Sequence, residues 1–105
     1  MMIEIRETEV YKKWFSSIKD KKTRSIIDVR IRRVSLGNFG DVEPVGRGVS
    51  ELKINYGPGF RIYLLNQGNV IIILLCGGDK STQEEDIHKA LDLAQRIRNR
   101  SNDKK

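Results

Sequence analysis

The chain has 105 residues, 38% hydrophobic and 32% charged, which suits one small globular domain with a single core. The net charge of +6 favours an acidic partner, with nucleic acid first, an acidic protein second and an anionic membrane last. The single cysteine, Cys76, excludes an intramolecular disulfide, and together with the single His88 it excludes a conventional zinc site. The N-terminus lacks the apolar segment of a signal peptide, so we expect a cytoplasmic protein. We also expect that the protein needs no cofactor.

The N-terminal third predicts a short strand and two helices. Ile3 and Ile5 alternate with charged residues, as in a strand. Thr8 is a candidate N-cap for a first helix, whose apolar residues recur at helical spacing: Val10, Trp14 and Ile18. The segment 20–22 ends that helix, and a second helix is predicted over about 22–36.

The outer face of the second predicted helix is basic, with five cations: Lys22, Arg24, Arg30, Arg32 and Arg33. Two interpretations stay open. The charges can simply be solvated, or they can line a groove for an RNA backbone or for an acidic segment of a partner.

Residues 37–48 contain several glycines and a proline, and we expect them to be irregular, with Arg47 on a glycine-flanked tether. A hairpin follows, because Gly57-Pro58-Gly59 requires a turn between two alternating segments. If the apolar residues of both segments are buried together, the strands must pair positions of equal parity, for example Leu52 with Ile62 and Ile54 with Phe60.

That register places Lys53 directly opposite Arg61 on the other face of the hairpin, with Glu51 opposite Tyr63. Two like charges across a hairpin normally destabilise it. We therefore expect the two cations to lie side by side on an open sheet surface and to bind an anion.

Residues 70–76 are apolar on both faces, which predicts a central strand covered on both sides. Ser81 to Glu84 reads as a capping box that opens a last helix, and residues 99–105 are expected to be a basic, frayed tail. The predicted order is β-α-α-β-β-β-α in one domain, 1–105. The class is α+β, with a small antiparallel sheet, a helical hairpin on one face and a C-terminal helix.

Two motifs in this order, GPGFRIY over 57–63 and GGDKSTQ over 77–83, resemble the RelE/ParE superfamily of type II toxins. Within it, the chain is most similar to the HigB-like "addiction module killer protein" branch. The resemblance implies a RelE/ParE-like fold and a metal-independent endoribonuclease, an mRNA interferase that inhibits translation on the ribosome. It also implies a helix-turn-helix antitoxin as partner, with operator DNA bound only through the toxin–antitoxin complex.

RNA cleavage without a metal requires a base for the 2′-hydroxyl, cations around the phosphate and an acid for the leaving oxygen. The resemblance places Arg61 at the scissile phosphate. Lys53 is the candidate base, if Arg61 depresses its pKa, and Lys80 is a candidate for holding the backbone or for acting as acid. The candidate RNA-binding residues are Arg47, Tyr56 and Tyr63, although either tyrosine can equally be a packing residue.

The chain departs from active members of the superfamily in one respect, since its last helix has no tyrosine or histidine after His88. The general acid is therefore open. Two alternatives also stay open, a ParE-like DNA gyrase inhibitor without nuclease activity and a non-toxic operon co-repressor.

Overall fold

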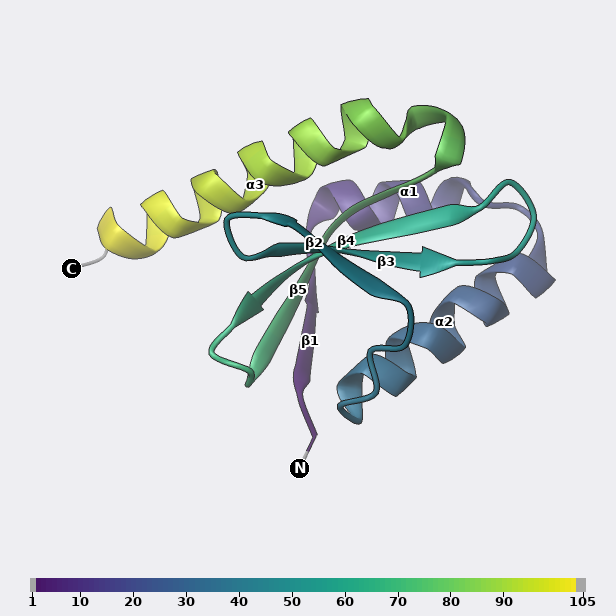
Figure 1. The fold of residues 1–105 in the computed structure, drawn as a ribbon, viewed down its shortest axis with the longest axis horizontal. Coiled ribbons are helices and arrows are strands. Elements are labelled where there is room, and N and C mark those ends of the chain that lie inside the picture. Colours follow the sequence, from purple (N-terminus) through teal and green to yellow (C-terminus); the bar gives the residue numbers. More distant parts are fainter. Residues whose placement is uncertain (1, 104–105) are drawn as a thin grey trace.

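The computed structural model describes residues 2–103 and contains one mixed sheet between two helical layers (Figure 1). No helix in this part of the chain combines the length and apolar character that a membrane crossing requires. The elements follow in chain order as β1 (Glu4–Glu7), α1 (Glu9–Ser17), α2 (Lys21–Ser35), β2 (Val42–Gly46), β3 (Val49–Ile54), β4 (Phe60–Gln67), β5 (Ile71–Asp79), the 3-10 turn η1 (Lys80–Thr82) and α3 (Gln83–Asp103).

The sheet has the strand order β1-β5-β4-β3-β2. Strands β2 to β5 are antiparallel neighbours, and β1 joins the other edge parallel to β5. The α+β class is confirmed, but the sheet is mixed and not antiparallel throughout as predicted, because β1 is parallel to β5. The segment predicted to be irregular contains strand β2, and Pro44 is compatible with it because β2 is an edge strand, where a missing backbone donor is tolerated.

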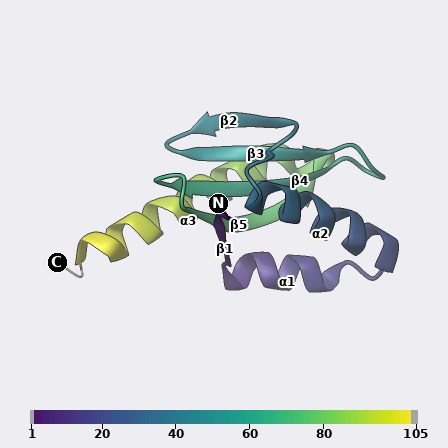
Figure 2. The ribbon, with the colours of Figure 1, turned by 90° about the horizontal axis from the view of Figure 1, so that it is seen from below.

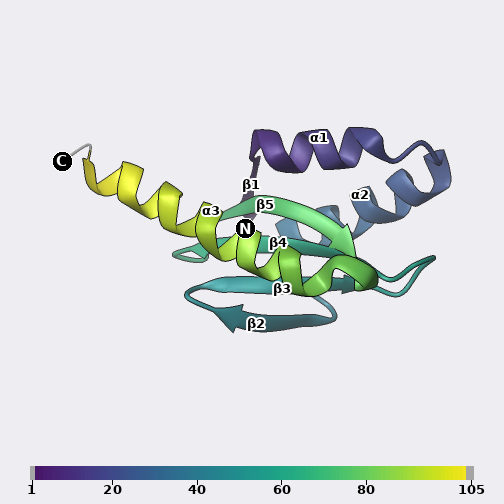
Figure 3. The ribbon, with the colours of Figure 1, turned by 90° about the horizontal axis from the view of Figure 1, so that it is seen from above.

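Helices α1 and α2 cover one face of the sheet and α3 covers the other, as the two opposite views in Figures 2 and 3 show. The first core cluster joins the sheet to α1 and α2 through Tyr11, Ile27, Leu52 and Ile62. The second joins the sheet to α3 through Tyr63, Leu65, Ala90 and Ala94. A bulge at the β4–β5 pairing places both Leu75 and Cys76 in this second cluster, so β5 is covered on both faces, as predicted.

The helix ends are explained by side-chain caps. Thr8 caps α1 by accepting from the backbone N–H of Tyr11 at 3.0 Å, and Asp20 caps α2 by accepting from that of Thr23 at 3.2 Å. The capping box before the last helix was predicted at Ser81 to Glu84. It is instead formed by Asp79 and Thr82, around η1. Helix α3 continues to Asp103, past residue 99, where the tail was expected to begin; residues 104–105 lie outside the described part.

Candidate active site

The β3–β4 hairpin positions the two predicted strand cations. Gly57 and Gly59 both have positive φ, 57° and 79°, which side chains other than glycine rarely adopt, so the turn is fixed by its sequence. In the resulting register Lys53 pairs with Arg61, Leu52 with Ile62 and Ile54 with Phe60, which confirms the predicted pairing. The parity of the strands places both cations on the face that α3 covers.

Two carboxylates compensate these cations. Glu43 on β2 pairs directly with Glu51 on β3, beside the Lys53–Arg61 pair. A pair of carboxylates therefore lies next to a pair of cations in the sheet. Lys53 Nζ lies 2.6 Å from Glu43 Oε2, and Arg61 Nε lies 3.9 Å from Glu51 Oε1. The repulsion expected between like charges across a hairpin is therefore offset within the sheet. We call Glu43, Glu51, Lys53 and Arg61 the strand quartet.

Glu51 is the buried centre of the quartet, with 2% of its side chain exposed. The Tyr63 hydroxyl donates to its carboxylate at 2.9 Å, and the Gln83 amide, in the first turn of α3, donates at 2.8 Å. Burial, followed by the hydrogen bond to Glu51, raises the pKa of Tyr63 well above the ordinary tyrosine value. Tyr63 is therefore a neutral hydrogen-bond donor that holds the carboxylate in place.

The guanidinium of Arg61 is only partly engaged by its neighbours. Its Nε is buried and has no hydrogen-bond partner within residues 2–103, because 3.9 Å to Glu51 is too long for a hydrogen bond. Its Nη1 donates to the backbone carbonyls of Gly59 and Phe60, each at 3.4 Å, which is beyond the usual range for such bonds. Arg61 thus retains donor capacity at its weakly bonded Nη1, whereas the unpartnered Nε is closed to solvent.

Lys80 belongs to the same end of the sheet. It is exposed at the start of η1, directly after Asp79, which pairs with Phe60. A methyl group on Gly59 would lie 3.5 Å from Lys80 Cβ and 3.7 Å from Arg61 Nη1. Both distances are those of ordinary van der Waals contact, so Lys80 and Arg61 both flank the turn at Gly59.

Two details of the predicted site are wrong. The surface is not open, since the side chains of Lys53 and Arg61 are only 27% and 11% exposed. Nor is Lys53 poised as a base, because its hydrogen bond and charge interaction with Glu43 raise its pKa. Lys53 is therefore a stable cation in this arrangement.

None of the three predicted RNA-binding residues offers an exposed side chain beside Lys53 and Arg61. Tyr63 is fully buried under α3, so its assignment as an RNA contact is withdrawn. Tyr56 packs against the first core cluster, on the side of α1 and α2. Arg47 is exposed in the β2–β3 turn, at the opposite end of β3, where its carbonyl accepts a hydrogen bond from Arg98.

Gly77 and Gly78 shape the boundary between the site and the two helical layers. A Cβ on Gly77 would lie 2.4 Å from the Trp14 ring on one face, and a Cβ on Gly78 would lie 1.8 Å from Asp86 Oδ2 on the other. These glycines therefore permit α1 and α3 to approach β5 closely, a role in shape and not in chemistry.

Comparison with known proteins identifies a close sequence relative. No family model matches the sequence. The chain is 47% identical over 97 residues to an uncharacterized protein of Haemophilus influenzae, with 92% of this chain and 98% of the relative covered. The chain belongs to the same family as that protein.

Solved structures show what fold this family has. One is a doubly substituted form of the E. coli toxin RelE in its free state, with a TM-score of 0.70, 12% identity, and 92% of this chain and 99% of that chain covered. Another is the RelBE2 toxin–antitoxin complex of Mycobacterium tuberculosis, with a TM-score of 0.60, 11% identity, and 76% and 100% covered. The family therefore has a RelE-like fold, as the two motifs predicted.

Proposed function

We propose that the protein is the toxin of a type II toxin–antitoxin system and inhibits translation as an mRNA interferase of the HigB-like kind. The likeness to toxin RelE over almost the whole of both chains supports the toxin assignment. The observation that carries the nuclease assignment is the convergence of Lys53, Arg61 and Lys80 at one end of the sheet.

The chemistry follows from the state of each cation. Attack of the 2′-hydroxyl on the adjacent phosphate builds negative charge on the phosphoryl oxygens, and the weakly bonded Nη1 of Arg61 is the donor suited to stabilise it. Lys53, kept protonated by Glu43, is suited to charge stabilisation or to protonating the leaving 5′-oxygen, in place of the base role first assigned. Exposed Lys80 is suited to holding the RNA backbone next to Arg61.

The partner in this proposal is a helix-turn-helix antitoxin that neutralises the toxin, and the pair binds operator DNA. The solved structure of RelBE2 as a toxin–antitoxin complex supports an antitoxin partner for this fold. A small helix-turn-helix protein encoded next to this chain, and co-purifying with it, is the expected observation.

The test is expression of the wild-type chain and of Arg61→Ala in bacteria, with mapping of mRNA 5′ ends. Cleavage is expected to fall on the order of 100-fold in Arg61→Ala, the usual loss for removing one charge stabiliser. Lys89→Ala is the control, since Lys89 is an exposed cation on α3 away from the strand quartet, and its cleavage should be unchanged. A folded Arg61→Ala protein that cleaves as well as the wild type would refute the site.

A gyrase inhibitor of the ParE kind is the second candidate function. The observation in its favour is that each strand cation already faces a carboxylate, so the quartet carries no net charge toward RNA. This function predicts growth arrest with intact transcripts, blocked supercoiling and no effect of Arg61→Ala. A chain whose expression leaves growth unchanged would favour the non-toxic co-repressor.

A further inference from the structure

The excess positive charge of the molecule lies in one helical layer. Between Glu9 and Ser35, the bounds of α1 and α2 together, the chain has nine lysines and arginines and three acidic residues, a net charge of +6. This equals the net charge of the whole chain, so the remaining residues sum to zero. The layer lies on the face of the sheet opposite α3 (Figures 2 and 3), whereas strand parity places the strand quartet on the α3 face.

Few of these nine cations are used internally. Lys12 pairs with Glu9 at 3.4 Å, and Arg30 points inward, where it donates to the carbonyls of Phe39 and Lys53 at 3.1 Å each. The other seven make no ion pair with any residue that the structure describes: Lys13, Lys19, Lys21, Lys22, Arg24, Arg32 and Arg33. All seven are exposed except Arg24, which is partly buried.

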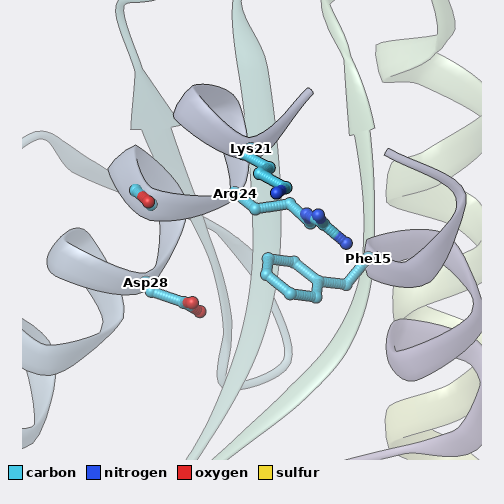
Figure 4. A pocket seen from close by; sticks show the side chains of 5 residues that line it. Phe15, Lys21, Arg24 and Asp28 are labelled. Carbon is cyan, nitrogen blue, oxygen red and sulfur yellow. The ribbon is translucent and has the colours of Figure 1, made fainter. Parts of the chain in front are cut away.

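A pocket of about 370 Å³ lies between the end of α1 and the start of α2. Its lining combines an aromatic ring, two cations and a carboxylate: Phe15, Lys21, Arg24, Ser25 and Asp28. Figure 4 shows Lys21 and Arg24 extending toward the Phe15 ring from one side, with Asp28 on another wall. An aromatic surface beside paired cations is the combination that binds an unstacked base and its phosphate.

We infer that the outer face of the α1–α2 hairpin is a docking surface for RNA, centred on the pocket at Phe15, which takes one unpaired nucleotide. Lys21 and Arg24 bind the phosphate, and the base stacks on Phe15. Asp28 repels a phosphate on its side of the pocket and accepts from the amino group of a base, which orients the nucleotide. The remaining cations of α2 contact the flanking backbone without reading sequence.

Charge alone also fits an acidic protein segment, and Val29 on α2 and the C-cap residue Leu36, 50% and 60% exposed, are apolar contacts that such a segment would use. The pocket favours RNA, because it places an aromatic ring beside two cations, the groups that contact a base and its phosphate. The biological role of this surface rests on the proposed function, but RNA binding is measurable without any cleavage.

The experiment measures the affinity of the purified chain for a labelled RNA hairpin with an unpaired loop, as a function of KCl concentration. The test variant is Lys21→Gln/Arg24→Gln. The control is Lys89→Gln/Arg100→Gln, which removes the same charge from two exposed residues of α3 that do not line the Phe15 pocket. The test variant should bind about tenfold more weakly, and the slope of log K against log salt should fall by between one and two, as expected for two lost phosphate contacts. The control should change affinity by less than about twofold.

Phe15→Leu tests the stacking contact, and it should weaken binding to the looped hairpin but not to a fully paired duplex. Equal losses in the charge variant and its control would overturn the proposal, because the effect would then reflect net charge alone. Tighter binding of polyglutamate than of RNA to the same residues would assign the face to an acidic protein. RNA affinity that survives in Arg61→Ala, whatever happens to cleavage, separates this surface from the proposed nuclease site.

Discussion

At the end of the β3–β4 hairpin each cation faces a carboxylate, whereas in the layer of α1 and α2 six cations without an ion pair are exposed to solvent. The difference follows from burial. A charge under α3 is costly unless it is paired, so Arg61 comes with Glu51, while an exposed lysine costs little without a partner. The two regions are suited to different tasks, since uncompensated surface charge attracts a polyanion and a held guanidinium acts at one phosphate.

The largest effect that separates the two regions is expected from Glu51→Ala. This change leaves Arg61 buried beside no carboxylate and removes the acceptor of Tyr63 and Gln83. Breaking a buried pair from one side typically costs about 3–5 kcal/mol of the free energy of unfolding. Urea denaturation measures the loss.

Two further variants make this stability prediction specific. Glu51→Gln should lose less than Glu51→Ala, because the amide oxygen still accepts a hydrogen bond. Glu85→Ala removes an exposed carboxylate of α3 and should stay within about 0.5 kcal/mol of the wild type. If Glu51→Ala were no more destabilising than Glu85→Ala, the quartet would not be the buried, paired unit described above.

A smaller effect is expected where the helical layer begins, from Thr8→Ala. Thr8 caps α1 and its hydroxyl also donates to the Leu75 carbonyl at 2.6 Å. Losing an N-cap costs about 1 kcal/mol, measured by thermal unfolding, and Thr8→Ser should restore most of it. RNA affinity of the folded variant should not change, because no cation moves. Weaker RNA binding with unchanged stability would contradict the division of tasks.

The smallest effect is expected from Glu43→Gln, which releases Lys53 without changing any buried group. RNA affinity should rise about two- to fivefold, because Glu43 would no longer compete with RNA for Lys53 and an exposed ion pair contributes a free energy of that size. The Lys53 hydrogen bond lowers the pKa of Glu43 below its ordinary value. The stabilisation from the Lys53–Glu43 ion pair is therefore fully present above that ordinary value and is lost as the pH falls through the folded-state pKa.

The advantage of Glu43→Gln over the wild type should therefore vanish at acid pH, where the wild-type carboxyl is protonated and also releases Lys53. Titrating RNA binding of both proteins against pH measures this. A difference that persists at acid pH, or that never appears, would show that Glu43 does not restrain Lys53.

The hairpin register could be predicted from sequence because burying both apolar sets restricts the pairing to registers of equal parity, and the observed register is the one given as an example. The β2 strand could not, since Pro44 and its neighbouring glycines are typical of loops, and only its position at the sheet edge makes a proline tolerable.

Because β2 was not predicted, the site was predicted only in part. Strand parity already places Glu51 on the face of Lys53 and Arg61, and this signal identifies one carboxylate of the quartet. Glu43 reaches Lys53 only because β2 pairs with β3, and Tyr63 is buried only because α3 lies over it. The inward direction of Arg30 likewise depends on the loop at Phe39 and on β3, which its own helix does not reveal.

Measuring RNA affinity and cleavage side by side in two variants tests the division between these regions most directly. Arg61→Ala should lose cleavage on the order of 100-fold and keep its RNA affinity. Lys21→Gln/Arg24→Gln should lose affinity about tenfold and still cleave when RNA is saturating. If both variants lose both properties in parallel, the strand quartet and the helical layer are one site, and this account is wrong.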